Sequence, residues 1–432
     1  MSDAPVKDPG YTLKYQQGEI DLGYHPASEG AGGLDISSLL STTGNVTLDP
    51  GFVNTASCSS AITYIDGDHG ILRYGGYPIE QLAQRSTFLE VSYLLIHGEL
   101  PDEEQLKTFC DEVTYETMVH EEVKSFFRSF HRDAHPMPVL SSAVSALSTF
   151  YQDRIDPFDP ESLHVQTIRL LAKAPTLAAY AYKSSIGEPL MYPHNSMGYV
   201  ENFLRLTFGV PAEPYKVDPK FARALDMLFI LHADHEQNCS TSTVRLVGSS
   251  QVNMFAAVSA GINALFGPLH GGANQAVLEM LETIQERGLT IDQFVEKIKN
   301  REDGLRLMGF GHRVYKSYDP RAAIVKENAH DILEDAHMPM LDLALELEEK
   351  ALSDDYFVER KLYPNVDFYT GLLYKAMGFP TNMFTVLFAL GRMPGWIAHY
   401  REMINDPATR IGRPRQVYTG PVKRDYVPLE QR

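Results

Sequence analysis

The sequence predicts a mainly α-helical protein with a small β-containing region near the N-terminus. From about Pro78 onward, segments such as IEQLAQRSTFLEVSYLLIHG place apolar residues three and four positions apart, which is the period of an amphipathic helix. Residues 11 to about 80 differ, because short alternating stretches such as HGILRYGG are interrupted there by Gly, Asp and Asn. The first pattern favours helices, and the second favours strands joined by turns.

The helical period continues through the rest of the chain, where strong strand signals do not return. It is seen in DEEQLKTFCDEVTYETMV, QAVLEMLETIQERG, IDQFVEKIKN, PMLDLALELEEKALSD and MFTVLFALGRMPGWIAHYREMI. Residues 281–381 are richer in charge than the segments around them. We therefore predict a β-containing region over 1–60, a large helical domain over 61–280 and 382–432, and a small helical domain over 281–381.

Composition narrows the class of protein and its partners. The 432 residues are 44% hydrophobic and 22% charged, which is usual for a globular protein with room for two domains. A formal net charge of −18 argues against nucleic acid or an anionic membrane as a partner, because both attract positive charge. The acidic start MSDAPVKDPGYTLKY has the pattern of neither a secretory nor a mitochondrial leader.

Cysteine usage bears on the compartment and on metal binding. The chain has three cysteines at wide spacing, Cys58, Cys110 and Cys239. An odd number at this spacing fits neither a disulfide framework nor a zinc site. We therefore expect the reducing environment of the cytoplasm.

One uncharged run, residues 246–269, is long enough to span a bilayer. Gln251, Asn253 and Asn263 interrupt its apolar character, as do several glycines and Pro268. A helix that is apolar on all sides is found either in a membrane or in the core of a large protein. We expect a helix buried near the centre of the molecule.

The segment LHADHEQN places His232 and His235 three residues apart, and so on one face of a helix. Together with Asp234 or Glu236 such a pair could bind a metal ion, but the order H-E-x-x-H is absent and no second group of ligands is evident. A packed or hydrogen-bonded histidine at a helix end is the favoured interpretation.

The segment GPLHGGAN places His270 at or just before the start of a helix that begins near Asn274 and stops at Gly288. The helix dipole disfavours a positive imidazolium there, so we expect a neutral ring that can donate one hydrogen bond. The alternative is a histidine that only spaces the loop.

The segment GFGHRVYKSYDPRA gathers four basic or titratable residues behind two glycines. They are His312, Arg313, Lys316 and Arg321. Two glycines alone are a weak phosphate signal, since the P-loop lysine and the Rossmann spacing are absent. The group as a whole is suited to a small ligand with several negative charges.

The segment YPNVDFYTG places Asp367 at the start of a short helix, where it is expected either to cap the helix or to act as a general base. Further arginines follow, whose planar side chains suit carboxylate ligands. These are Arg392, Arg410, Arg413 and Arg415.

Together these segments resemble the citrate synthase family. HADHEQN, GPLHGGAN, GFGHRVYKSYDPRA, YPNVDFYTG, GWIAHY and RPRQVYTG occur in the order of that family and at about its spacing, over nearly the whole chain. The length and the N-terminal region look like the long form found in Gram-negative bacteria. The resemblance implies a citrate synthase-like two-domain helical fold whose domains close over the substrate.

The resemblance also implies an activity. An acyltransferase of the tricarboxylic acid cycle condenses acetyl-CoA with oxaloacetate and water to citrate and CoA, by enolisation, attack on the ketone and hydrolysis of citryl-CoA. Acetyl-CoA is a substrate, and no cofactor or metal is implied. A homodimer is the minimal unit, and a homohexamer is the expected assembly.

Individual roles follow from matched positions in the family's motifs. His270, His312 and Asp367 match its catalytic residues. His235, Arg321, Arg392 and Arg413 match the residues that hold oxaloacetate, with Arg413 matching one that a neighbouring subunit contributes. Ser240 matches a hydroxyl that orients the first histidine, and the expected CoA site consists of Leu307, Met308, Gly309, Phe310, Gly311 and Asn365.

Three alternatives stay open. A 2-methylcitrate synthase would use propionyl-CoA, and one methyl group in an apolar pocket changes binding by only about 1 to 3 kcal/mol. A non-catalytic acyl-CoA-binding protein would keep the arginines but would not need the two histidines and the aspartate together. A metallohydrolase would use HADHEQN.

A regulatory site found in many Gram-negative relatives binds NADH through basic residues and a cysteine. Arg169, Lys173 and Tyr151 match that site, but a key arginine is replaced by Tyr115 and the cysteine by Ala212. The loss of one charge-assisted hydrogen bond lowers affinity by about ten- to hundredfold. We predict that NADH inhibits weakly or not at all.

Overall fold

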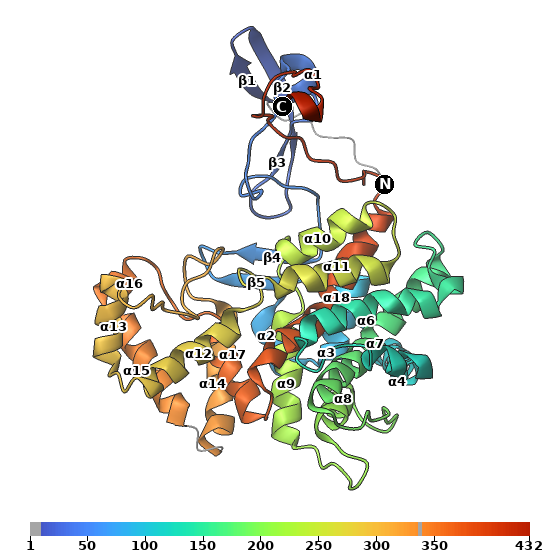
Figure 1. Ribbon diagram of the computed structural model, residues 1–432, viewed down its shortest axis with the longest axis vertical. Coiled ribbons are helices and arrows are strands. Elements are labelled where there is room, and N and C mark those ends of the chain that lie inside the picture. Colours follow the sequence, from blue (N-terminus) through green and yellow to red (C-terminus); the bar gives the residue numbers. More distant parts are fainter. Residues whose placement is uncertain (1–9, 336–338) are drawn as a thin grey trace. The chain divides into compact units, whose positions relative to one another are not determined.

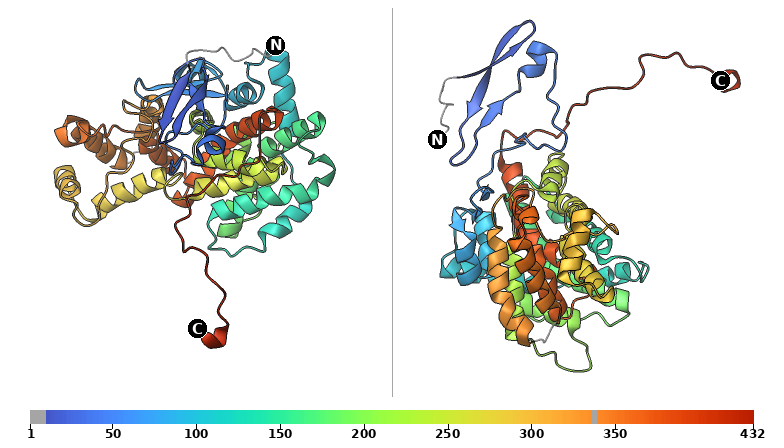
Figure 2. Two further views of the ribbon diagram at one scale, coloured as in Figure 1. Left: turned by 90° about the horizontal axis from the view of Figure 1, so that it is seen from above. Right: turned by 90° about the vertical axis from the view of Figure 1, so that its left-hand side faces the viewer.

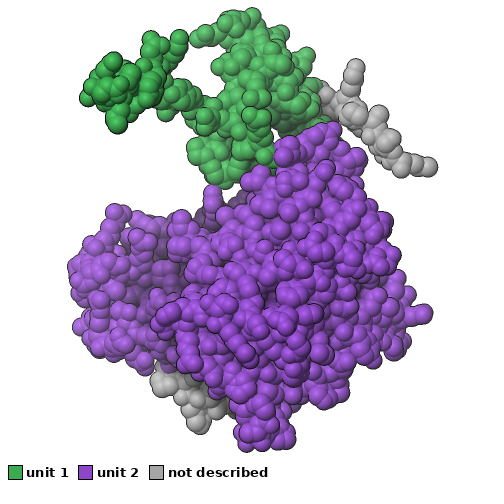
Figure 3. All heavy atoms as spheres, turned by 45° about the vertical axis from the view of Figure 1, so that its right-hand side comes forward, with its two compact units in different colours: residues 1–59, 412–432 green, residues 60–411 purple. Residues whose placement is uncertain are grey.

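Apart from the short helix α1 (Leu39–Thr43), strands come first and helices follow from Ile79 onward, as the sequence predicts. The computed structural model describes residues 10–335 and 339–432. Residues 1–9, to which the prediction of no leader applies, lie outside the described residues. The chain divides into two units, residues 1–59 with 412–432 and residues 60–411 (Figure 3).

The first unit contains an antiparallel sheet in the order β1-β2-β3. Its strands are β1 (Tyr11–Tyr15), β2 (Gly18–His25) and β3 (Gly33–Asp35), and they are followed by α1 (Leu39–Thr43). Ile20 and Leu22 alternate with exposed neighbours on β2, so one face of this strand is buried. The C-terminal residues of this unit contain one short helix, η3 (Leu429–Gln431).

The second unit begins with an antiparallel sheet in the order β4-β5-β6. Its strands are β4 (Thr63–Asp66), β5 (Ile71–Tyr74) and β6 (Tyr77–Pro78). Helices then follow one another: α2 (Ile79–Arg85), α3 (Phe88–His97), α4 (Glu103–Tyr115), α5 (Glu121–Phe127), α6 (Pro136–Phe150), η1 (Gln152–Arg154), α7 (Pro160–Ile186), α8 (Tyr199–Phe208), α9 (Pro219–His232), α10 (Cys239–Gly248) and α11 (Met254–Phe266). Turn and cap residues such as Asp102, Asp159 and Asn238 start several of them by accepting a backbone N–H.

The remaining helices are α12 (Ala273–Glu286), α13 (Ile291–Asn300), α14 (Pro320–Asp335), α15 (Pro339–Ser353), α16 (Asp355–Val358), α17 (Asp367–Ala376), η2 (Thr381–Met383) and α18 (Phe384–Asn405). Helices α12 to α17 lie together on one side of the second unit (Figures 1 and 2). Whether they move as the predicted small domain, 281–381, stays a prediction.

Helix α18 lies at the centre of the second unit. Nearly every residue from Phe384 to Tyr400 is buried, so the helix has no exposed face over that length. It packs against α3, α7, α9, α10 and α11 (Figure 1). Side chains from several of these helices therefore converge on one helix, and this places the site described below.

The uncharged run 246–269 is not one helix. Helix α10 ends at Gly248, and α11 begins only at Met254, with Asn253 accepting the Ala256 N–H as its cap. The polar residues between them form a turn, so the expectation of a single helix is wrong, whereas α11 is buried as expected. Within residues 10–335 and 339–432, no helix has the length and apolar character needed to cross a bilayer.

Candidate active site

Three aromatic side chains from two segments meet in the second unit. His235 lies in the loop between α9 and α10, and His312 and Tyr315 lie in the loop before α14. The ring centroids of His235 and His312 are 5.3 Å apart, and those of His312 and Tyr315 are 4.8 Å apart. Nε2 of His235 is 3.3 Å from the Tyr315 hydroxyl. The structure thus joins the HADHEQN and GFGHRVYKSYDPRA segments.

Arg321 is held by a carboxylate that the sequence reasoning missed. Nε and one terminal nitrogen of Arg321 each donate to Asp319 at 3.0 Å, in a fork geometry. Asp319 also accepts the Val366 N–H at 3.1 Å. Burial opposes the charge on Arg321, but Asp319 outweighs it and raises the pKa of Arg321. The same carboxylate therefore fixes a guanidinium and the residue before Asp367.

His312 is oriented by two backbone donors. The N–H groups of Val314 and Tyr315 both point at His312 Nδ1, at 3.0 and 3.2 Å. Nδ1 must therefore be the acceptor, and in the neutral ring Nε2 carries the proton. Burial, and then the charge of Arg321, lowers the pKa of His312 to about 4. The ring is a neutral donor at Nε2.

His270 is oriented in the opposite sense. Its Nε2 lies 3.2 Å from the Ser240 backbone N and 2.9 Å from the Ser240 hydroxyl. Because a backbone N–H can only donate, Nε2 is an acceptor and Nδ1 carries the proton. Burial, and then the charge of Arg392, lowers the pKa of His270 to about 4. The contact with Ser240 agrees with the hydroxyl expected to orient this ring, and the role of the pair in catalysis stays a prediction.

The Ser240 hydroxyl is itself held by two further side chains. It lies 2.8 Å from Asn238 Oδ1, and the indole N–H of Trp396 donates to it at 3.1 Å. Trp396 is fully buried on α18 and is the only tryptophan of the chain. The sequence reasoning did not single it out, because nothing in its spacing connects residue 396 with residue 240.

Asp367 does not cap its helix. It is the first residue of α17, Val366 occupies the cap position, and no side chain caps the end. Asp367 is half-buried, and its backbone N–H donates to Asn365 Oδ1 at 3.0 Å. Burial raises the pKa of Asp367 to about 6, against the charge of Arg321. The capping interpretation is wrong, and the carboxyl has the raised basicity that a general base requires.

Arg392 is the second buried guanidinium near these groups. Its Nε donates to the backbone oxygen of His232 at 2.5 Å, and one terminal nitrogen is buried without a hydrogen-bond partner. Burial lowers the pKa of Arg392 to about 10. Burial, and then the charge of Arg321, also holds the pKa of His235 well below its usual range. A buried donor without a partner beside this histidine is suited to an anionic ligand.

The expected CoA loop lies beside the segment that leads into Asp367. Gly309 and Gly311 have φ of 78° and 77°, which favours glycine. Asn365 donates its backbone N–H to Gly309 O and its amide to Gly311 O, both at 2.9 Å. Phe310 pairs with Pro364 in an isolated bridge, and Leu307 and Met308 precede it in the same loop. That these residues bind CoA stays a prediction.

Arg413 belongs to the first unit, where it is exposed. Every other predicted site residue belongs to the second unit.

His232 packs in the interior, with Nδ1 2.7 Å from Leu228 O, as a histidine at a helix end was expected to do. Among the residues that the structure describes, no three His, Cys, Asp or Glu side chains gather in a way that could hold a metal ion.

The two basic residues matched to the NADH site, Arg169 and Lys173, are already paired with Glu116. Lys173 is buried, and its ammonium donates to the Glu116 carboxylate at 3.0 Å and to Met118 O at 2.7 Å. Arg169 donates to the same carboxylate at 3.3 Å and lies over the ring of Tyr151, 4.2 Å from its centroid. Glu116 thus neutralises charge that a diphosphate would need.

The fold and these side chains are typical of one class of protein, a mainly helical enzyme in which neutral histidines, buried arginines and a carboxyl of raised pKa belong to one site. Residues 51–415 match the family described as citrate synthase, C-terminal domain. The chain is 66% identical to citrate synthase 1 of Mycobacterium tuberculosis, over 98% of each chain. It is 61% identical to the citrate synthase of Corynebacterium glutamicum, over 97% of each.

Solved structures of citrate synthases are also similar to this chain. The citrate synthase of Pyrobaculum aerophilum superimposes with a TM-score of 0.81 at 36% identity, over 100% of both chains. The ternary complex of carboxymethyl coenzyme A and oxaloacetate with the citrate synthase of Thermoplasma acidophilum gives a TM-score of 0.81 at 32% identity, over 89% of this chain and 100% of that one. The chain belongs to the citrate synthase family.

Family membership decides several expectations. The mainly α-helical fold class is confirmed, and so are the citrate synthase function and the acyltransferase class of enzyme. The 2-methylcitrate alternative is not favoured. The assignment to the Gram-negative long form gains no support, because the curated relatives named above come from Mycobacterium and Corynebacterium.

Proposed function

We propose that His270, His312 and Asp367 catalyse the condensation of acetyl-CoA with oxaloacetate, in a pocket where His235, Arg321 and Arg392 hold the ketoacid. The observation that carries this proposal is the pair of neutral histidines with opposite tautomers, together with a carboxyl whose pKa is raised to about 6. The charges of Arg321 and Arg392 act on these groups: that of Arg321 on His312, that of Arg392 on His270, and both on Asp367. Supporting evidence for the two substrates comes from the relative from Thermoplasma acidophilum, whose complex contains oxaloacetate and a CoA derivative.

The ketoacid binds first in this scheme. Its two carboxylates need fixed positive donors, and two arginines are already held in place, Arg321 by Asp319 and Arg392 by the His232 carbonyl. Neither guanidinium has to be reoriented to meet a carboxylate. Such preorganised donors lower the cost of binding.

Enolisation of acetyl-CoA comes next. The α-proton of a thioester is far less acidic than a carboxylic acid, so Asp367 needs help from stabilisation of the enolate. His270 Nδ1–H donates to the thioester oxygen as charge develops there, in the manner of an oxyanion hole. The Ser240 N–H at Nε2 keeps the proton on Nδ1 throughout.

The enol carbon then attacks the ketone of oxaloacetate. His312 Nε2–H donates to the ketone oxygen and protonates it as the new carbon–carbon bond forms. The product, citryl-CoA, is a thioester, and water hydrolyses it to citrate and CoA. The proposed chemistry uses no cofactor and no metal ion.

Several finer assignments belong to this proposal. Arg413 completes the ketoacid site of a neighbouring subunit, which makes a homodimer the minimal active unit and allows a homohexamer. The enzyme works in the cytoplasm, within the tricarboxylic acid cycle, and neither nucleic acid nor a membrane is a partner. The residues Leu307 to Gly311 and Asn365 bind CoA.

Thiol release in the presence of a thiol reagent tests this function. With oxaloacetate present, acetyl-CoA should be turned over much faster than propionyl-CoA, and thiol release should stop when oxaloacetate is omitted. Faster turnover of propionyl-CoA would instead identify a 2-methylcitrate synthase. Thiol release that does not depend on oxaloacetate would indicate a thioesterase.

A further inference from the structure

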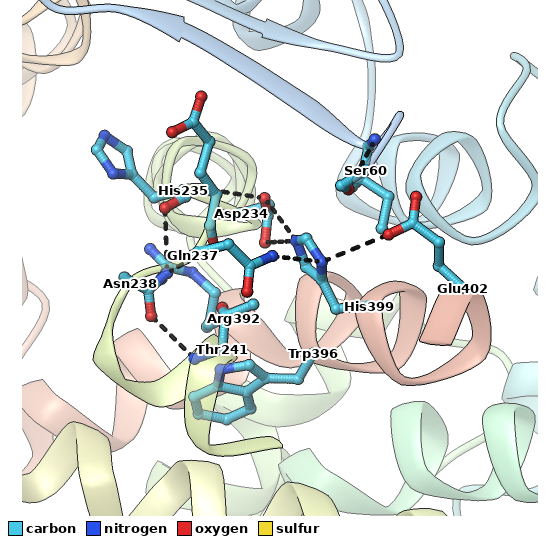
Figure 4. Close-up of polar contacts among 12 residues, drawn as sticks. Ser60, Asp234, His235, Gln237, Asn238, Thr241, Arg392, Trp396, His399 and Glu402 are labelled. Atoms are coloured by element: carbon cyan, nitrogen blue, oxygen red, sulfur yellow. Dashed lines mark hydrogen bonds and ion pairs between the residues drawn. The ribbon is translucent and has the colours of Figure 1, made fainter. Parts of the chain in front are cut away.

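Helix α18 contacts three successive residues at the end of α9 and the start of the following loop: His232, Ala233 and Asp234. Arg392 donates to His232 O at 2.5 Å, the Gly395 N–H donates to Ala233 O at 3.1 Å, and both carboxylate oxygens of Asp234 lie 3.3 Å from His399 Nε2. Figure 4 shows Asp234 and His399 facing each other, with Arg392 and Trp396 on the same helix. His235 is the next residue of this loop.

The residues Pro394 and Gly395 of α18 make this close approach possible. Pro394 lies inside the helix and has no N–H to donate, and its ring disturbs the bond to the preceding turn. A Cβ on Gly395 would lie 2.2 Å from Ala233 O, so a larger residue could not let the loop approach. The segment R-M-P-G-W-I-A-H therefore brings a guanidinium, a free backbone N–H and an imidazole to one loop.

The contacts of His399 fix its tautomer. Nε2 faces the Asp234 carboxylate, so it carries the proton. Nδ1 faces two donors, Arg245 at 3.2 Å and the Gln237 amide at 3.4 Å, so it accepts. Glu402 pairs with Arg245 at 2.8 Å and accepts the Ala61 N–H at 2.9 Å. A proton on Nε2 and a lone pair on Nδ1 therefore fit the contacts with Asp234, Arg245 and Gln237.

Asp234 also shapes the loop that carries His235. Its Oδ2 accepts the Glu236 N–H at 3.0 Å, and Glu236 has φ of 50°, a conformation that costs energy for a residue other than glycine. The side chain of Asp234 is fully buried, and that of His399 is 1% exposed. A buried carboxylate is costly unless it is paired, and here the pair lies directly beside a ligand-binding residue.

We propose that Asp234 and His399 are a positioning pair that fixes the loop around His235, and with it the anion pocket next to Arg392. Neither residue needs to touch the substrate. The inference rests on the proposed function and adds two residues to its site, of which one, His399, was not singled out by the sequence. The pair acts on ketoacid binding and not on proton removal from acetyl-CoA.

Four variants test the pair. His399→Leu removes the donor and leaves Asp234 buried without it. His399→Gln is the conservative variant, because its amide N–H can still donate to Asp234. Asp234→Asn removes the negative charge and replaces one of the two oxygens that lie 3.3 Å from His399 Nε2 with an amide donor, so a donor then faces a donor. The double variant Asp234→Asn with His399→Gln restores a partner, since the glutamine oxygen can accept from the asparagine amide.

Each variant is measured for KM of oxaloacetate, KM of acetyl-CoA, kcat and thermal unfolding. Oxaloacetate binding is also followed by the emission of Trp396, which lies four residues after Arg392 and three before His399. Lys183→Met is the matched control, because Lys183 is likewise fully buried and paired, with Glu188 and with Gly209 O, at the far end of α7. It should lower stability and leave both KM values unchanged.

We expect His399→Leu and Asp234→Asn to raise the KM and the Kd of oxaloacetate about tenfold or more, with the KM of acetyl-CoA unchanged. His399→Gln should keep most of the affinity, and the double variant should bind oxaloacetate better than Asp234→Asn alone. If His399→Leu does not fold, the oxaloacetate affinities of Asp234→Asn and of the double variant still show whether the contact between the two side chains supports ketoacid binding.

Two results would overturn the inference. One is a set of variants that unfold at lower temperature but bind oxaloacetate as the wild type does, as Lys183→Met should. The other is a double variant that is no better than Asp234→Asn. Failure of the proposed function is a different result, namely a wild-type protein with no oxaloacetate-dependent thiol release.

Discussion

Asp367→Asn should make the folded protein more stable at neutral pH even though it removes the proposed catalytic base. Burial raises the pKa of Asp367 from 3.8 to about 6, so the folded state disfavours the charge that this carboxyl carries at pH 7. The asparagine variant has no such charge to bury. A site that is destabilising in the resting protein and required for turnover is the expected signature of a catalytic group.

The magnitude follows from the pKa difference. A rise of roughly two units corresponds to about 3 kcal/mol, because each unit is worth about 1.4 kcal/mol. Because the pKa of this carboxyl is higher in the folded state than in the unfolded state, ionisation of Asp367 destabilises the fold. The destabilisation is complete above about pH 6, declines as the pH falls between about 6 and 3.8, and is absent below 3.8. The gain from Asp367→Asn should thus be largest at pH 8 and about half as large at pH 5.

Asp319→Asn is the matched control for this experiment. Burial opposes the charge of Asp319, but Arg321 outweighs it and lowers the pKa of Asp319. Its ionised form accepts from Arg321 and from the Val366 N–H, so the same chemical change should destabilise here. Urea unfolding at the two pH values measures both variants. An Asp367→Asn protein that is less stable than the wild type at pH 8, or a gain that does not change with pH, would refute the reasoning.

Further expectations concern the histidines, regulation and assembly. His312→Ala should raise the KM of oxaloacetate and lower kcat, whereas His270→Ala should mainly lower kcat; steady-state kinetics that show the reverse would interchange the two roles. NADH should inhibit weakly or not at all at saturating acetyl-CoA, because Glu116 already pairs with the basic residues of the matched site; strong inhibition at low micromolar NADH would contradict this. Mixing Arg413→Ala subunits with Asp367→Asn subunits should restore part of the turnover, and no recovery in verified mixed dimers would place Arg413 in its own subunit's site.

Much of the site could be read from the sequence because its residues are concentrated in a few segments. His312 directly follows a glycine and Arg321 a proline, His270 is followed by two glycines, and Asp367 begins a helix. These local signals do not depend on the rest of the fold. The family resemblance then supplied the roles. The structure adds the hydrogen bonds that orient these side chains.

What sequence reasoning missed depends on contacts between distant residues. Asp319 orients Arg321 locally but also holds Val366, 47 residues further along the chain. Trp396 reaches Ser240 across 156 residues, and His399 reaches Asp234 across 165. No periodicity or spacing in a single sequence encodes such pairs, because the packing of α18 against α9 and α10 brings them together.

Two errors have local causes. The run 246–269 was expected to be one helix because charge and apolar character were weighed over the whole run, whereas the polar turn after Gly248 and the Asn253 cap divide it. Asp367 was considered as a cap because Asp is common there, but the helix begins one residue earlier than that role requires. The Gram-negative form is a different case: it was inferred from the length and the β-containing N-terminal region, and it gains no support because relatives from Mycobacterium and Corynebacterium match over nearly their whole length.

The central claim is that Asp367 removes the proton that makes acetyl-CoA a nucleophile. It is tested most directly by citrate formation at pH 8 with saturating oxaloacetate and acetyl-CoA, in the wild type and in Asp367→Asn, alongside oxaloacetate binding reported by Trp396. We predict that citrate formation falls about a thousandfold or more while the Kd of oxaloacetate stays within a factor of about three. Turnover above about a tenth of the wild-type rate would contradict the assignment of Asp367 as the base.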